Sequence, residues 1–235
     1  MNWSITIWTA LLLSASACSV SRYVEPLEHK QHAVNASVGG PLARVPGIGV
    51  MPLPVSSLGY AYGLHKNATV YGNWHTTAAV FGVVQLELGA SVRWWQHENG
   101  SMGVSTQHGF HWMMDVFEKN HRLYPTLDAN YYWHYLQKTT QKRTESERKW
   151  NNYVYGGMSN WFDLRATKAH GLEQTNRLIF APQIGHVFKG KHWDIFTEFK
   201  LLGPGKANDK VVVDYISPLR DKGALGVYVG CSFKW

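Results

Sequence analysis

The sequence predicts an all-β protein, an antiparallel transmembrane β-barrel of eight to ten strands, with ten favoured. Apolar and polar residues alternate through most of the chain from residue 58 onward, which is the period of a strand. The alternation runs unbroken over residues 80–94, longer than an ordinary soluble strand and suited to a tilted strand that crosses a bilayer. Helical periodicity is nearly absent from the same region. We therefore expect one barrel domain over residues 58–235.

Residues 80–94 show the strand pattern most clearly. Val84, Leu86 and Leu88 belong to a wholly apolar face, whereas Gln85 and Glu87 lie on the opposite face. Turn-forming residues separate several such blocks. The other expected strands are 58–64, 68–75, 102–114, 127–136, 150–162, 176–188, 192–201, 210–216 and 225–235. The count falls to eight if the first block and the weak block at 210–216 lie outside the wall.

The beginning of the chain has the layout of a secretory signal peptide over residues 1–17. An apolar run, Ile5–Leu13, precedes the small residues Ser14-Ala-Ser-Ala17 and is too short to span a bilayer as a helix. Two cleavage patterns fit. Ala15-Ser-Ala17 suits ordinary signal peptidase, whereas the same residues followed by Cys18 resemble a lipobox, which implies that Cys18 is acylated.

Residues 18–57 form a distinct region without sustained periodicity. It is rich in glycine and proline, as in Gly39-Gly-Pro41 and Pro46-Gly47. We expect an irregular N-terminal tether, anchored by lipid if Cys18 is acylated and lying on the periplasmic side. The chain holds only two cysteines, Cys18 and Cys231, so no disulfide framework is expected.

The last strand alternates up to its final residue, Trp235. It resembles the closing strand of bacterial outer-membrane barrels, whose terminal aromatic residue is an assembly signal. The resemblance implies an outer-membrane location, insertion by the barrel-assembly machinery and a signal formed by Val229, Phe233 and Trp235. Tryptophans also recur at the ends of expected strands, as in the aromatic girdles of such barrels; they are Trp74, Trp94, Trp112, Trp133, Trp193 and Trp235.

Polar residues on the opposite strand faces are expected to point into the lumen and to satisfy one another there. Asp128 and His134 are the residue types of a nucleophilic relay, but structural ion pairs are the expected role of the whole set. The members of this predicted luminal network are Glu87, Arg93, Asp128, His134, Asp194, Glu198, Lys200 and Lys234.

No metal or other cofactor is expected from the sequence, although the chain holds 12 histidines. His108 and His111 would lie on opposite faces of one strand, and His29 with His32 lacks an evident third ligand. The formal net charge of +7 is compatible with nucleic acid as a partner, but export argues against that class. Outer-membrane lipid and anionic lipopolysaccharide are the expected counterparts.

These observations predict a non-catalytic outer-membrane protein that serves as a scaffold, adaptor or accessory subunit of an envelope complex. A barrel of this size is too narrow for a general porin. The first alternative is a lipid-modifying enzyme of the lipid A deacylase or acyltransferase kind. The deacylases carry a His-x-Ser-Asn pattern. Ser159-Asn160 resembles the end of this pattern, but Gly157 stands at the position of its histidine. The second alternative is a soluble, lipocalin-like barrel.

Overall fold

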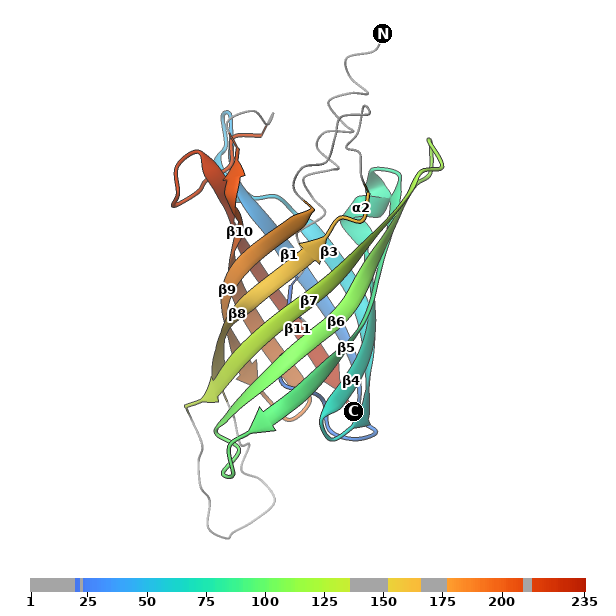
Figure 1. Cartoon of the computed structure of the whole chain (residues 1–235), viewed down its shortest axis with the longest axis vertical. Coiled ribbons are helices and arrows are strands. Elements are labelled where there is room, and N and C mark those ends of the chain that lie inside the picture. The colour runs from blue at the N-terminus through green and yellow to red at the C-terminus, as the bar shows by residue number, and fades with distance from the viewer. Residues whose placement is uncertain (1–19, 22, 136–151, 166–176, 209–212) are drawn as a thin grey trace.

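Among the residues that the structure describes, ten antiparallel strands form a closed barrel, and one further short strand extends beyond it (Figure 1). The computed structural model describes residues 20–21, 23–135, 152–165, 177–208 and 213–235. Each wall strand pairs with its neighbour in sequence, and β11 pairs with β1 to close the wall. The wall strands are β1 (His32–Val45), β3 (Val55–His65), β4 (Ala68–His75), β5 (Val83–Gln96), β6 (Met102–Asp115), β7 (His121–His134), β8 (Tyr153–Phe162), β9 (Leu178–Lys189), β10 (Trp193–Ala207) and β11 (Lys222–Lys234).

Side chains alternate between a polar lumen and an apolar exterior. Along β4, Thr69 and Asn73 are buried inside the barrel, whereas Val70 and Trp74 are exposed on its outer face. A soluble barrel has the reverse polarity, because its apolar side chains fill the interior. An apolar outer face is stable where it meets lipid, as in membrane-spanning barrels. Within the described residues, no helix has the length and apolar character needed to cross a bilayer.

Exposed aromatic side chains collect around the end of the barrel where β1 begins and β11 finishes. His32 and Trp235 exchange backbone hydrogen bonds there, and their rings stack with centroids 5.7 Å apart. Phe233 packs against both Trp193 and Trp235. The arrangement fits an aromatic girdle at a lipid–water boundary; its other exposed members include Tyr60, Trp94, Trp95, Trp133 and Tyr135.

The barrel begins much earlier than residue 58, because β1 lies inside the region expected to be a tether. Val34 and Val38 are exposed, while Ala33, Asn35 and Ser37 are buried, so the period of two is present. The alternating run is short and leads into Gly39-Gly-Pro41, residue types typical of turns and tethers, which hide the strand in the sequence. The expected boundary between residues 57 and 58 therefore moves to residues 31 and 32.

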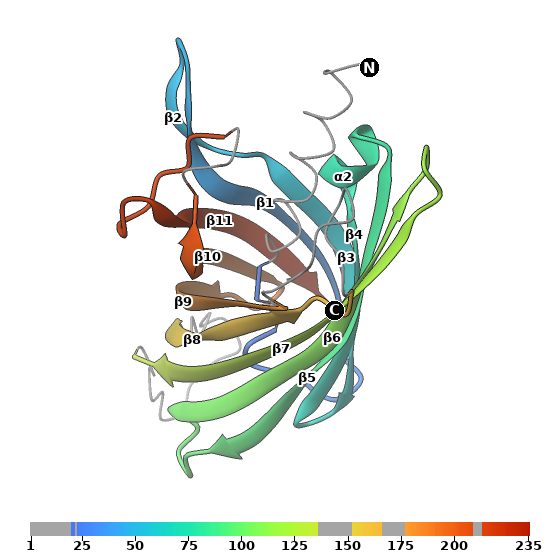
Figure 2. The ribbon, with the colours of Figure 1, turned by 45° about the horizontal axis from the view of Figure 1, so that its top comes forward.

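Glycine and proline mark a change of partner within β1 and do not end the strand. A Cβ atom on Gly39 would lie 2.3 Å from the Val227 carbonyl oxygen, and one on Gly40 would lie 2.2 Å from that of Leu53. Only glycine permits so close an approach of backbones. Beyond Pro41, β1 leaves β11 and pairs with β2 (Gly49–Pro52) in a hairpin that projects past the wall (Figure 2).

Two expected strands differ from the structure. Val80 ends a short helix, α2 (Thr76–Val80). A turn follows, in which Gly82 has a φ of +77°, and the wall strand starts at Val83. The described part of 210–216 is not a wall strand. It crosses the projecting end of β1, where Tyr215 pairs with Ala43 and Asp214 forms an ion pair with Arg44. The count of ten is confirmed, with β1 in place of this segment.

The outward face of β5 provides a test of the lipid environment. Leu88 lies near the middle of this strand and is half exposed, so we expect Leu88→Arg to destabilise the barrel by about 2–4 kcal/mol in phospholipid vesicles. Equilibrium unfolding in urea measures the change. Leu64→Arg, at the end of β3, is the matched control and should cost at most about 1 kcal/mol. Equal, near-zero effects at both positions would contradict a lipid-facing exterior.

Candidate functional site: the occupied lumen

The described residues just before β1, 20–21 and 23–31, run through the barrel interior; we call them the luminal segment (Figure 2). Val20, Val24 and Leu27 are at least nine-tenths buried. Each contacts a different patch of the inner wall. Val20 packs with Ala181, Leu202, Ala224 and Tyr228. Val24 packs with Tyr132, Tyr153, Tyr155 and Val187. Leu27 packs with Ala33, Ala61 and Tyr71.

The backbone of the luminal segment is hydrogen-bonded by side chains of the wall. The Leu27 N–H donates to the Thr69 hydroxyl of β4 at 2.8 Å. The hydroxyls of Ser91 on β5 and Ser105 on β6 donate to the carbonyl oxygens of Tyr23 and Val24, at 2.6 and 2.5 Å. An extended segment without these partners would bury unsatisfied backbone groups at a cost of about 1–3 kcal/mol each. The wall is therefore chemically matched to this occupant.

A buried charge centre holds the first described residues of the segment. The Ser21 N–H donates to both carboxylate oxygens of Glu198, at 3.3 and 3.2 Å, and the Ser21 hydroxyl donates to Asp128 at 3.4 Å. Glu198 is completely buried; Lys200 lies 3.4 Å from its Oε1, and the Tyr155 hydroxyl donates to its Oε2 at 2.7 Å. A carboxylate so buried is stable only with partners of this kind.

A second charged contact holds the middle of the segment. Glu25 forms an ion pair with Lys189 of β9, and its Oε2 atom lies 3.5 Å from His134 Nε2 on β7. Burial by itself raises the pKa of Glu25, but the cation of Lys189 and the contact with His134 outweigh it and hold this pKa at about 2. Glu25 is thus ionised throughout the physiological range, and its charge is matched inside the barrel.

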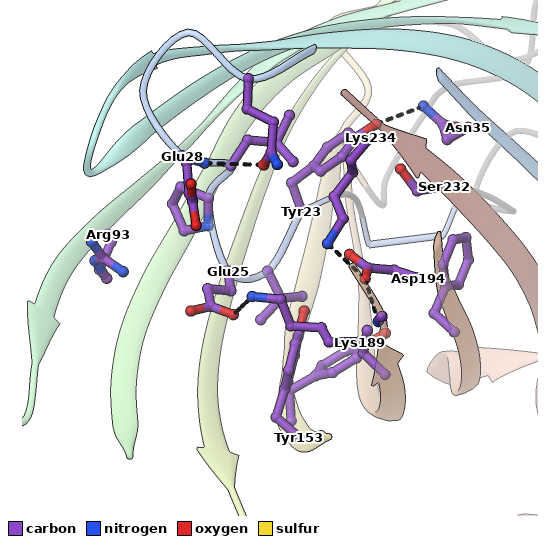
Figure 3. Close-up of a pocket in the computed structure, with 18 of the residues that line it drawn as sticks. Tyr23, Glu25, Glu28, Asn35, Arg93, Tyr153, Lys189, Asp194, Ser232 and Lys234 are labelled. Atoms are coloured by element: carbon purple, nitrogen blue, oxygen red, sulfur yellow. Dashed lines mark hydrogen bonds and ion pairs between the residues drawn. The ribbon is translucent and has the colours of Figure 1, made fainter. Parts of the chain in front are cut away.

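Beside the luminal segment lies a polar cavity of about 480 Å³ (Figure 3). Its charged side chains largely face one another. Lys234 donates a hydrogen bond to Asp194 at 2.8 Å. The carboxylate of Glu25 points toward the ammonium group of Lys189, and both residues line the cavity (Figure 3). The remaining charged lining residues are Glu28, Lys66, Arg93 and Lys191. The cavity can hold water, ions or a small polar solute, and the segment forms one of its sides.

The predicted luminal residues do not form one network and lie in several separate places. Asp128, Glu198 and Lys200 surround Ser21, while His134, Asp194 and Lys234 lie near Glu25 and the cavity. Glu87 lies elsewhere, with two histidines. Arg93 is only partly buried and binds the turn after β3 through the Lys66 carbonyl and the Asn67 side chain. Asp128 and His134 contact different residues of the luminal segment and form no relay in the structure.

Glu25 and Lys189 are not part of the luminal network that the sequence predicts. Glu25 lies in the region expected to be a tether, for which the sequence predicts no partner inside the barrel. The available signal was the pairing of an acidic residue near the N-terminus with inward-facing lysines on late strands, but a sequence does not show which lysine it meets. Cys18 lies outside the described residues. Val229 and Trp235 are half exposed on the outer face, and their role as an assembly signal stays a prediction.

No protein-family model and no curated protein sequence matches this chain. Solved structures of barrels do resemble it. The NanC porin is 7% identical over 86% of this chain and 100% of its own, with a TM-score of 0.47. An outer membrane channel from Pseudomonas putida F1 is 11% identical, with 92% of this chain and 100% of the channel covered, and the TM-score is again 0.47. The translocator domain of the autotransporter NalP from Neisseria meningitidis is 10% identical, with 99% of this chain and 98% of that domain covered, and the TM-score is 0.41. Such distant likenesses say nothing about what this chain binds or transports.

Proposed function

We propose that this chain is an outer-membrane barrel closed by its own luminal segment, and that it serves as a non-catalytic scaffold or accessory subunit of an envelope complex. The observation that supports this proposal best is the occupied lumen. The segment is bound by wall strands on all sides of the barrel, including β4, β5, β6, β7, β9 and β10. A barrel that served as an open pore would lose these contacts whenever it conducted.

The energetics favour a lumen that stays closed at rest. The segment makes the hydrogen bonds and ion pairs described above and buries the side chains of Val20, Val24 and Leu27. Hydrogen bonds of this kind contribute about 0.5–1.5 kcal/mol each, so their release requires several kcal/mol. With the lumen filled, the outer face and the connections at the two ends are the surfaces left for partners.

The lipid-modifying alternative is less well supported by the geometry. Ser159, the serine that would follow the deacylase pattern, is 2% exposed and faces the lumen, where Asp128 lies opposite it in the register of β7 and β8. A hydroxyl in that position does not meet lipid on the outer face. Gly157 occupies the position at which the pattern requires histidine. We therefore place the scaffold ahead of the enzyme.

We propose that Cys18 is acylated, as its lipobox-like setting indicates; it lies outside the residues that the structure describes. Labelled palmitate should enter the wild-type chain and be lost in Cys18→Ala. A wild-type chain that takes up no label would favour an ordinary signal-peptidase cut after Ala17.

Removal of the luminal segment should open the barrel. We expect the wild-type protein to be silent in planar lipid bilayers and a variant lacking residues 20–30 to conduct small ions, because the vacated path joins the cavity. Single-channel recording measures the difference. Replacement of residues 46–48, in the turn of the projecting hairpin, is the control and should leave the barrel silent. Steady wild-type openings as large as those of the deletion would rule out a closed barrel.

The Glu25 ion pair predicts how closure depends on pH. Because the pKa in the folded protein, about 2, lies below the ordinary value of 4.5, the stabilisation is fully present above pH 4.5 and is lost as the pH falls toward 2. Bilayer recordings should therefore stay silent from pH 8 to pH 5 and show openings at lower pH. The Glu25→Gln barrel should show openings at neutral pH, because Lys189 loses its ion-pair partner. Glu28→Gln, on the exposed part of the same segment, is the matched control.

Purification from native membranes in mild detergent tests the scaffold role. We expect a partner of defined stoichiometry to elute with the full chain and to be identified by mass spectrometry. Lipid A from a deletion strain is analysed in parallel. A chain that always elutes alone, together with an altered acyl pattern of lipid A in the deletion strain, would favour the enzyme over the scaffold.

A further inference from the structure

A second polar cluster lies in the barrel interior, on strands β4, β5 and β6. His75 on β4, Glu87 on β5 and His111 on β6 come from three adjacent strands. Their exposed fractions are 1%, 4% and 1%, so all three are effectively removed from solvent. Each offers one ligand atom, and these atoms lie within 4.8 Å of one another. The closed-barrel proposal makes no use of the cluster.

The strand register produces this convergence. Glu87 and His111 are directly opposite each other in the ladder of β5 and β6. On the other side, Glu87 pairs with Asn73, and His75 is two positions further along β4, on the same inward face. A shift of the register by one residue would turn one of the three side chains toward lipid.

The distances are close to those of a shared metal ion. Nε2 of His75 lies 3.3 Å from Glu87 Oε2, and Nε2 of His111 lies 4.0 Å from Glu87 Oε1. Two ligands held about 2.0–2.1 Å from one tetrahedral ion are about 3.3 Å apart. The first pair therefore already has the spacing of coordinating atoms. The second pair, at 4.0 Å, would have to close by about 0.7 Å to reach that spacing.

The surroundings hold the two rings in place. The ring of His111 stacks on Trp161, with centroids 4.0 Å apart, and its Nδ1 lies 3.4 Å from the Gln85 side-chain amide. The nearer atom is the amide nitrogen of Gln85, which donates to Nδ1 as placed; a half-turn of this amide would let its oxygen accept a hydrogen bond from Nδ1–H, the tautomer that carries its lone pair on Nε2. Nδ1 of His75 is buried and has no hydrogen-bond partner in the described part of the chain. The ring nitrogen of His75 that lies close to Glu87 is Nε2, the atom proposed below to coordinate.

We propose that His75, Glu87 and His111 bind one divalent first-row transition metal ion, with Zn²⁺ as the representative. Two imidazoles and one carboxylate favour Zn²⁺, Ni²⁺ or Cu²⁺ over Ca²⁺ and Mg²⁺, which prefer oxygen ligands. Three protein ligands leave a fourth coordination position for water or another small ligand. The ion also offsets the buried carboxylate and joins three wall strands.

Zinc titration of the full-length barrel, purified in detergent and freed of metal, tests the site. Isothermal calorimetry should show one equivalent of Zn²⁺ bound, and Co²⁺ should give the visible absorption of a four- or five-coordinate ion. We expect His75→Gln, Glu87→Gln and His111→Gln each to weaken binding at least about 100-fold. His108→Gln is the matched control, because His108 lies three residues before His111 on the opposite, exposed face of β6.

Thermal unfolding provides a second measurement that does not depend on calorimetry. Zn²⁺ should raise the unfolding temperature of the wild type and of His108→Gln, but not that of the three ligand variants. If one ligand variant does not fold, the other two still decide the matter. A wild-type chain that binds far less than one equivalent, or ligand variants that bind like the wild type, would overturn the proposal. A Zn²⁺ affinity lost equally in His108→Gln would indicate surface histidines and overturn it as well.

Discussion

The rest of the structure depends on the closure of the wall between β1 and β11. Closure leaves no free edge, so every strand satisfies its backbone hydrogen bonds in the wall, as a bilayer demands. It also fixes the polarity of the side chains. The apolar face has to point to lipid, and most polar side chains of the wall are directed into a narrow interior, where few can reach bulk water.

That narrow interior has to be satisfied internally, and the luminal segment contributes to this. Serine and threonine hydroxyls of the wall would otherwise face a lumen too small for free hydration. The segment supplies carbonyl oxygens and N–H groups for Thr69, Ser91 and Ser105, and its Glu25 matches Lys189. Occupancy of the lumen and stability of the wall are thus two aspects of one hydrogen-bond network.

The cluster of His75, Glu87 and His111 obeys the same constraint in a different way. Its carboxylate lies between two imidazoles. A cation held by these three residues would place positive charge beside Glu87, as Lys200 does beside Glu198. The lumen therefore divides into a part filled by the chain itself and a part whose chemistry suits a metal ion.

Much of the wall could be predicted from the sequence, because the period of two is local. Strands with strong contrast between faces, such as β4, β5 and β7, were found with their inward and outward sides correct. β1 is not among the predicted strands, because its short alternating run leads into Gly39-Gly-Pro41, which by sequence indicates a tether. The alternation predicts which polar residues face inward, but it does not show which of them meet.

By itself, the sequence determined an all-β barrel with an apolar outside and a charged inside, since each residue's face follows from its place in the alternation. Only the tertiary structure decided what occupies the lumen and which side chains meet. Ser21 and Glu198 are 177 positions apart, and His75, Glu87 and His111 come together through the registers of two strand pairs. Register and docking depend on contacts between distant residues, which alternation along one strand cannot specify.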